Sequence, residues 1–395
     1  MSAVPQSLPP ESSAIAELNE AALGALRQGQ IAEACRTLTR AIEIEPAHRI
    51  LQGNLAYCLA REGWDHLDRG EIGRARAAFE QGLTLAPADP ALLGGLGLTQ
   101  LRSGDSSRAL FLLEEAQRAA PESQAFRLTL AQLYLERDDV DHAITQVEAL
   151  LVKEPGHAEA QRLLAKLTRE RGAEAGYWQD ESRHFAIRYR GGETEVRRAV
   201  LDGLERAYDR ISRELDVAVT EKIAVILSPE TVFREVTQVH PWTQALFDGR
   251  IRIPVGDRVG GLDQVLAHEL THALVHRLSR GRAPLWLQEG LAQELEGGGQ
   301  DARLAAVKQI PRGDPLPLDT LDALIRSSEE ERVRQGYLLA WSGVRALVER
   351  RGMDGVRDLL SRLGRGESWE ASFQASFGQP FREFTRDWAA SLAKS

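Results

Sequence analysis

Cysteine is almost absent from this chain of 395 residues. The two that occur, Cys35 and Cys58, lie on helical patterns far from the histidines and lack a CxxC spacing. We therefore expect both to be small core residues that provide no disulfide framework.

An excess of positive charge is lacking as well. The chain has 49 basic and 58 acidic residues, a net charge of −9. Without a basic stripe, neither nucleic acid nor an anionic membrane surface is a favoured partner. A run of about 20 apolar residues is also missing, so the sequence predicts no membrane span.

The first residues lack the charged segment followed by an apolar one that defines a secretory signal. Residues 1–14 are polar, contain Pro5, Pro9 and Pro10, and are expected to be a disordered N-terminal segment. As written, the chain is expected in the cytoplasm; if a signal was trimmed, it is expected in the periplasm or outside the cell.

The first half of the chain contains a repeat. The length of the whole chain suggests two or three domains. In the first half, prolines recur at intervals of 41, 34 and 34 residues, at Pro46, Pro87, Pro121 and Pro155. A small residue stands twelve positions before each proline: Ala34, Ala75, Ala109 and Ala143. An apolar residue stands eight before it: Leu38, Phe79, Leu113 and Val147.

A third position completes the pattern. Twenty-four residues before each proline stands another small residue: Ala22, Gly63, Gly97 and Ala131. Small residues let paired helices approach closely, and the proline ends the second helix. The pattern resembles the tetratricopeptide repeat over residues 15–171, as four units plus a final helix from His157 to about Glu170. The resemblance implies an all-α solenoid whose concave surface binds a peptide or protein partner.

The second half has a different pattern. Apolar residues alternate with polar ones at Phe185, Ile187 and Tyr189, which predicts a strand. Residues 193–215 are predicted to form a helix with one apolar stripe that begins at Val196. The continuous apolar run of residues 223–227 predicts a buried strand. A strand over residues 250–255 contains Pro254, which cannot donate a backbone hydrogen bond and so places the strand at a sheet edge, at least on that side. Such an edge could hold an extended substrate peptide, or its apolar side chains could simply pack on the core.

The segment His268-Glu269-Leu270-Thr271-His272 follows, on a helix predicted to begin at Gly260 and to end near residues 279–281. Residues four apart share one helix face, so His268 and His272 can bind one metal ion. Glu269 points elsewhere and is free to act as a base. After Pro284 a second helix carries Glu289, before three glycines at 297–299 end it.

These two segments, HELTH and the WLQEGLA of residues 286–292, resemble the gluzincin zinc peptidases, and most closely the peptidase MA-like domains that accompany such repeats in bacteria. The resemblance covers residues 178–390 and implies an α+β domain with one Zn²⁺ held by His268, His272 and Glu289, with Glu269 as general base. No GxMEN-like segment is present to bind a free amino terminus and the ligand spacing is slightly shorter, so an endopeptidase is expected rather than an aminopeptidase.

Several alternatives stay open around this set. Leu278 stands where a metzincin would carry a third histidine, and His276 is rotated away from His268. Glu294 and Glu296 are alternative ligands, and Gln293 could orient a ligand or be an exposed residue. Tyr337 is the candidate oxyanion donor by analogy with relatives, or a core aromatic; His240 is a weaker candidate.

Taken together, the sequence predicts a zinc metallopeptidase with a partner-binding repeat domain. The rival hypothesis is a non-catalytic tetratricopeptide scaffold that carries an inactive peptidase-like domain. Retention of Glu269 argues for the enzyme, because loss of the base is the simplest route to inactivity.

Overall fold

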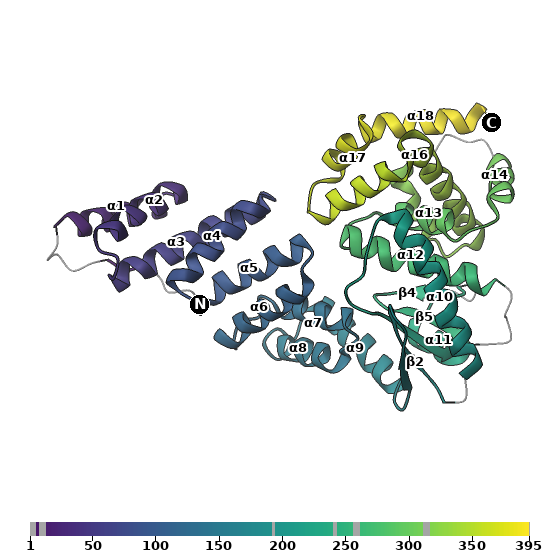
Figure 1. Ribbon diagram of the computed structural model, residues 1–395, viewed down its shortest axis with the longest axis horizontal. Coiled ribbons are helices and arrows are strands. Elements are labelled where there is room, and N and C mark those ends of the chain that lie inside the picture. The colour runs from purple at the N-terminus through teal and green to yellow at the C-terminus, as the bar shows by residue number, and fades with distance from the viewer. Residues whose placement is uncertain are drawn as a thin grey trace. The chain divides into compact units, whose positions relative to one another are not determined.

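The computed structural model describes residues 5–7, 13–191, 194–239, 243–255, 261–310 and 317–394 (Figure 1). The chain forms two compact units. Unit 1 contains residues 1–133 and 145–161, and unit 2 contains residues 134–144 and 162–395. Most of the predicted N-terminal segment 1–14 lies outside the described residues, as does Gly260.

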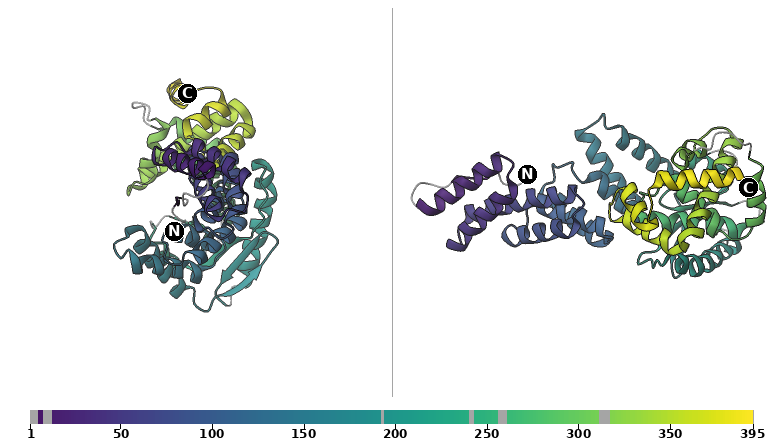
Figure 2. Two further views of the ribbon diagram at one scale, coloured as in Figure 1. Left: turned by 90° about the vertical axis from the view of Figure 1, so that its left-hand side faces the viewer. Right: turned by 90° about the horizontal axis from the view of Figure 1, so that it is seen from above.

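The first half consists of consecutive helices, seen in further views in Figure 2. Their bounds are α1 (Ser13–Arg27), α2 (Ile31–Ile44), α3 (Arg49–Asp68), α4 (Ile72–Leu85), α5 (Pro90–Ser103), α6 (Ser106–Ala119), α7 (Arg127–Glu136), α8 (Val140–Lys153) and α9 (Ala158–Ala173). The last of these agrees with the predicted final helix. The predicted domain boundary at residue 171 falls inside α9, whose residues from Arg162 are part of unit 2.

The small and large residues of the repeat pattern meet as expected. A Cβ atom added to Gly63 would lie 2.6 Å from the Phe79 ring, and one added to Gly97 would lie 2.9 Å from Leu113. Both large side chains are fully buried. Glycine therefore lets α3 approach α4 and α5 approach α6, and the large residue of each pair fills the space between the helices.

The two cysteines differ from expectation, because Cys35 and Cys58 form a disulfide with a Cα–Cα separation of 5.5 Å. The prediction of unpaired core residues was wrong on this point, although both are buried. The cause is the repeat packing. Cys35 on α2 and Cys58 on α3 occupy facing positions of adjacent helices, which spacing along the chain does not reveal.

Unit 2 contains a five-stranded sheet of order β1-β2-β3-β5-β4. Its strands are β1 (Trp178–Glu181), β2 (Phe185–Tyr189), β3 (Ile223–Pro229), β4 (Leu246–Phe247) and β5 (Ile251–Val255). β2, β3 and β5 are parallel, with Phe185 opposite Ile223 and Val225 opposite Ile251. β1 and β4 pair antiparallel with β2 and β5, respectively.

The predicted edge position of β5 is confirmed at Pro254, on the side away from β3, and needs correction for the start of the strand. β5 lies between β3 and β4, and the edge strand is the two-residue β4. β4 pairs only with Ile251 and Arg252. Pro254 lies opposite Ser228 of β3 and beyond the two residues that pair with β4. Its missing N–H therefore removes no hydrogen bond to β4.

Helices make up the rest of unit 2. They are α10 (Thr194–Leu215), α11 (Glu230–Thr237), α12 (Leu262–Ser279), α13 (Leu285–Leu295), α14 (Gln300–Lys308), the 3-10 turn η1 (Leu318–Thr320), α15 (Leu321–Ile325), α16 (Glu330–Gly364), α17 (Trp369–Phe377) and α18 (Phe381–Lys394). α16 bends at Gly352, which has a φ of 64°. The predicted apolar stripe of α10 is buried from Val200 onward, whereas Val196 is 39% exposed.

One hydrophobic core joins the sheet to α10, α12, α13 and the C-terminal helices. The predicted helical tail belongs to it, since Val344, Leu359, Phe373, Phe377 and Trp388 are all buried there. Among the described residues, no helix is both long and apolar enough to span a membrane.

Candidate metal centre

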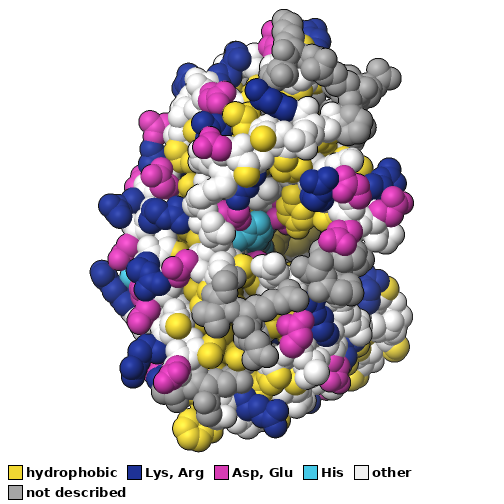
Figure 3. All heavy atoms as spheres, turned by 90° about the vertical axis from the view of Figure 1, so that its right-hand side faces the viewer, with side chains coloured by type: hydrophobic (Ala, Val, Ile, Leu, Met, Phe, Trp, Pro, Cys, Tyr) yellow, Lys and Arg dark blue, Asp and Glu magenta, His cyan; other side chains and the backbone are white. Residues whose placement is uncertain are grey.

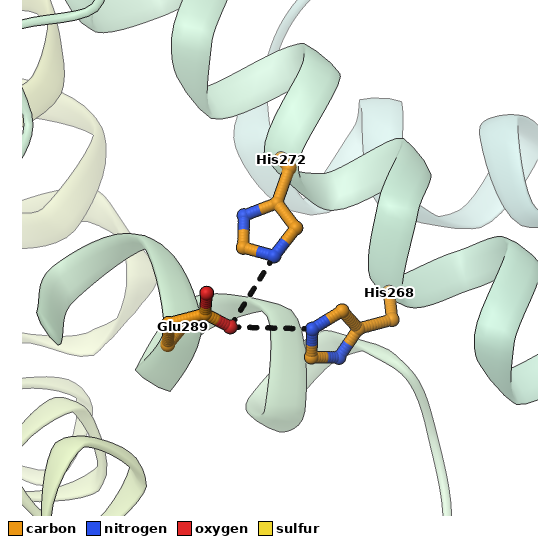
Figure 4. A group of neighbouring side chains, drawn as sticks. All are labelled: His268, His272 and Glu289. Atoms are coloured by element: carbon orange, nitrogen blue, oxygen red, sulfur yellow. Dashed lines mark ion pairs between the residues drawn. The ribbon is translucent and has the colours of Figure 1, made fainter. Parts of the chain in front are cut away.

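The first two candidate ligands lie on α12, whose ends are set by backbone geometry. The helix follows Gly261 and ends at Arg280, both in the left-handed conformation, and its buried face includes Leu266, Leu270 and Leu274. His268 and His272 are one turn apart, and both rings point toward the Glu289 carboxylate, as Figure 4 shows.

The third candidate, Glu289, is placed by α13. The Asp322 carboxylate accepts hydrogen bonds from the backbone N–H groups of Leu285 (3.2 Å) and Trp286 (2.8 Å), which caps the start of this helix. A Cβ atom added to Gly290 would lie 2.4 Å from the carbonyl oxygen of Ala340 on α16. The WLQEGLA segment is therefore a close-packed helix, and its packing turns Glu289 toward α12.

The three side chains converge. Glu289 Oε2 lies 3.3 Å from His268 Nε2 and 3.3 Å from His272 Nε2 (Figure 4). Ligand atoms about 2.1 Å from a tetrahedral zinc ion are about 3.4 Å apart, so these distances fit such an ion. Glu289 Oε2 is also buried without a well-formed hydrogen bond. The donor set of two imidazoles and one carboxylate suits zinc.

Electrostatics favour a cation at this point. Burial alone would raise the pKa of Glu289, but the positive charge of His272 and of His268, each 3.3 Å from its Oε2 atom, holds this pKa well below its usual range. Burial alone would lower the pKa of His268, but the carboxylates of Glu289 and Glu296, one at each ring nitrogen, raise it to about 10. Both shifts arise because a buried carboxylate between two imidazoles attracts positive charge.

Glu296 does not act as a ligand in this arrangement. Its Oε2 lies 2.7 Å from His268 Nδ1, on the opposite side of the ring from Glu289, and its other oxygen pairs with Arg303. A carboxylate on Nδ1 fixes the tautomer and orientation of a metal-binding histidine. Glu296, rather than Gln293, therefore lies where a carboxylate can orient His268.

The signal for Glu296 was available in the sequence. Glu289 and Glu296 are seven residues apart, which is two helical turns, so they share a face. Gln293 instead donates a hydrogen bond to the Tyr337 carbonyl (2.9 Å) and links α13 to α16. Glu294 accepts from the indole N–H of Trp341 at 2.8 Å and is not near the two histidines' ligand atoms.

Glu269, the candidate base, is buried beside the ligands but is not one of them. Burial raises its pKa, and the backbone N–H of Phe247 donates a hydrogen bond to its carboxylate. A raised pKa suits a group that accepts and returns a proton near neutral pH.

Tyr337 on α16 lies close to Glu289 and Glu269. Burial, the charges of Glu289 and Glu269, and a hydrogen bond to Glu289 all raise the pKa of its hydroxyl. The hydroxyl therefore stays protonated and can donate. Its ring also packs against the hydrophobic core, so the structure is compatible both with an oxyanion donor and with a core aromatic residue.

The remaining candidates lie elsewhere. His276 faces β4, with its ring 5.6 Å from that of Phe247, and burial lowers its pKa. His240 lies outside the described residues. In Figure 3 a histidine side chain lies at the bottom of a hollow, with acidic side chains beside it and hydrophobic ones along one wall.

Comparison with known families identifies the repeats. Two tetratricopeptide repeat models match residues 60–124 and 100–167. The chain is 33% identical over 116 residues to cellulose synthase operon protein C of Komagataeibacter sucrofermentans, covering 29% of this chain and 8% of that protein. It is 39% identical over 95 residues to TPR repeat-containing protein PA4299 of Pseudomonas aeruginosa, covering 24% and 38%. The chain thus spans well under half the length of these relatives and contains tetratricopeptide repeats.

Solved structures with tetratricopeptide repeats are also similar. A repeat protein from Parabacteroides merdae has a TM-score of 0.34 and 15% identity, covering 74% of this chain and 96% of that chain. YrrB, described as a TPR protein with an unusual peptide-binding site, has a TM-score of 0.31 and 16% identity, covering 38% and 74%.

Proposed function

We propose that this protein is a zinc-dependent hydrolase of peptide bonds, of endopeptidase type, whose repeats bind a protein partner or substrate. The observation that carries the proposal is the convergence of His268, His272 and Glu289, with Glu289 Oε2 at 3.3 Å from both Nε2 atoms. The partner-binding role rests on the tetratricopeptide repeats. The net negative charge does not favour binding to the negatively charged backbone of a nucleic acid.

The residues divide the chemistry among them. His268, His272 and Glu289 would hold the ion and leave one coordination position open; a bound zinc ion would polarise a carbonyl and acidify water. Glu269 accepts a proton from the attacking water and returns it to the leaving amine. Tyr337 donates a hydrogen bond to the developing oxyanion.

A second candidate is the non-catalytic repeat scaffold. The comparisons favour it, because the matching family models lie within residues 60–167. The buried Glu269 beside three converging ligands favours the enzyme, since a site that had lost its function would have no need for a buried carboxylate at this place.

One substitution separates the two candidates. Glu269→Gln keeps the size of the side chain and removes the base, so peptide hydrolysis should fall by about 10²–10⁴-fold while zinc stays bound. Turnover of an unstructured fluorogenic peptide would be measured with Glu294→Gln as the matched control. Equal turnover in Glu269→Gln and wild type would rule out the base assignment, and a zinc-loaded wild type without turnover would favour the scaffold.

The disulfide supports a proposal for localisation. The pairing of Cys35 with Cys58 favours an oxidising compartment, the periplasm or the cell exterior, over the cytoplasm. Titration of free thiols in protein isolated from its native host would test this, since two reactive thiols per unfolded chain would point to the cytoplasm.

A further inference from the structure

A cluster of buried charges lies at the end of α9, within unit 2. Glu170 of α9 and Glu174, which directly follows this helix, are buried together with Arg250 and Arg252 of the β4–β5 hairpin. The Arg252 guanidinium lies 2.9 Å from Glu170 and 2.7 Å from Glu174, and Arg250 also pairs with Glu170. The last helix of the repeat pattern thus packs on the hairpin through ion pairs.

Further pairs surround these four residues. Lys166 of α9 lies 2.8 Å from Asp248 at the hairpin turn, and Asp138 lies 3.2 Å from Arg250 and 2.5 Å from Arg188. Four acidic and four basic side chains therefore balance: Asp138, Glu170, Glu174, Asp248, Lys166, Arg188, Arg250 and Arg252.

Ion pairs of this kind determine position more than they add stability. A buried charge without its partner is strongly unfavourable, whereas the complete pair is close to neutral against an apolar replacement. Arg250 and Arg252 are each 3% exposed, so the hairpin cannot slide along α9 without leaving a charge unpaired.

The opposite face of the same hairpin reaches the candidate metal centre. Ile251 and Ile253 alternate with Arg252 and join the core that contains α12. In β4, the Phe247 ring lies 5.6 Å from that of His276, and the Phe247 N–H donates to the Glu269 carboxylate. Leu246, the neighbour of Phe247, pairs directly with Arg252.

We propose that α9 is a positioning element for Glu269, with Glu170 as its key positioning residue. Through Arg250 and Arg252, α9 holds the hairpin where the Phe247 N–H stays on the base. The final helix of the repeat pattern is then part of the hydrolytic unit, and a partner that displaces α9 would change turnover. This inference rests on the proposed function for its effect on turnover, but not for its effect on the hairpin.

Amide hydrogen exchange of residues 243–255 in the full-length protein tests the proposal without requiring activity. In Glu170→Gln the side chain keeps its size but loses its charge, so the Phe247 amide should exchange severalfold faster than in wild type. For peptide turnover, kcat should fall roughly tenfold to a hundredfold with KM and zinc content unchanged, because only the orientation of the base is altered.

The matched control is Glu159→Gln, the same change at an exposed position of α9, which should alter neither quantity. If Glu170→Gln fails to fold, Lys166→Met removes the pair with Asp248 at the turn and the longer 3.7 Å pair with Glu170, leaves the pairs of Arg250 and Arg252 with Glu170 in place, and should produce a smaller change of the same kind. Unchanged exchange at the hairpin, or faster exchange with unchanged kcat, would overturn the proposal. A wild type that binds zinc but cleaves nothing would defeat the proposed function alone, and exchange would then decide the coupling of α9 to the hairpin.

Discussion

At the residue scale, two carboxylates of one helix act on the same histidine from opposite sides. Glu289 lies at Nε2 of His268 and Glu296 lies at Nδ1. With a ligand on one nitrogen and an orienting carboxylate on the other, the imidazole is fixed in a single tautomer and direction.

Glu296→Gln should therefore weaken zinc binding by about 10- to 100-fold without removing a ligand. Competition with a fluorescent chelator would measure the affinity. Glu294→Gln is the control, because Glu294 belongs to the same helix but accepts its hydrogen bond from Trp341. Equal affinities in the two variants would show that Glu296 does not orient His268.

Tyr337 can be tested by removal of its hydroxyl alone. If the hydroxyl stabilises the oxyanion, Tyr337→Phe should lower kcat by about 10²–10³-fold and leave zinc content and thermal stability nearly unchanged. If the ring serves only the core, turnover should match that of the wild type, because phenylalanine fills the same space.

At the scale of elements, the close approach of α13 to α16 is what turns Glu289 toward the histidines. Gly290 makes the approach possible, since a Cβ atom there would lie 2.4 Å from the Ala340 carbonyl oxygen and 2.5 Å from Val344. Backbone on the facing helix cannot move aside as a flexible side chain can.

Gly290→Ala should destabilise the protein by about 1–3 kcal/mol and reduce zinc affinity, because α13 must move away from α16. Gly53→Ala is the control. It adds the same atom inside a helix where nothing lies within 4 Å, and should stabilise by about 0.5–1 kcal/mol. Chemical denaturation of both variants would provide the comparison, and a neutral Gly290→Ala would contradict the packing account.

Sequence reasoning succeeded where local periodicity carries the information. Gly63 with Phe79 and the helix spacing of His268 and His272 could be predicted because each depends on a repeat or a helical turn. It failed where distant segments meet. The Cys35–Cys58 disulfide depends on how adjacent helices face one another, and the position of β5 depends on a two-residue strand too short to be recognised.

At the scale of the whole molecule, the resemblance placed the start of the second domain at residue 178, but buried ion pairs join residues before and after this position. Arg250 and Arg252 pair with Glu170 on α9 and with Glu174 directly after it. No periodicity links these positions, so the sequence offered no sign that a repeat helix belongs to unit 2.

A fragment of residues 178–395 should therefore be much less stable than one of residues 134–395. The shorter fragment lacks both glutamates and the helix that covers Arg250 and Arg252, so it loses these ion pairs and the packing of α9 on the hairpin. Thermal unfolding followed by circular dichroism would compare them. Equal melting temperatures would show that α9 contributes nothing to this unit.

The zinc content of the purified protein shows whether His268, His272 and Glu289 bind a metal ion. Metal analysis of the purified full-length protein should find one zinc per chain in wild type and in Glu269→Gln, and far less in His272→Ala, because the first change spares the ligands and the second removes one. A wild-type protein that takes up no stoichiometric zinc, even when zinc is supplied, would contradict the assignment of His268, His272 and Glu289 as a metal site.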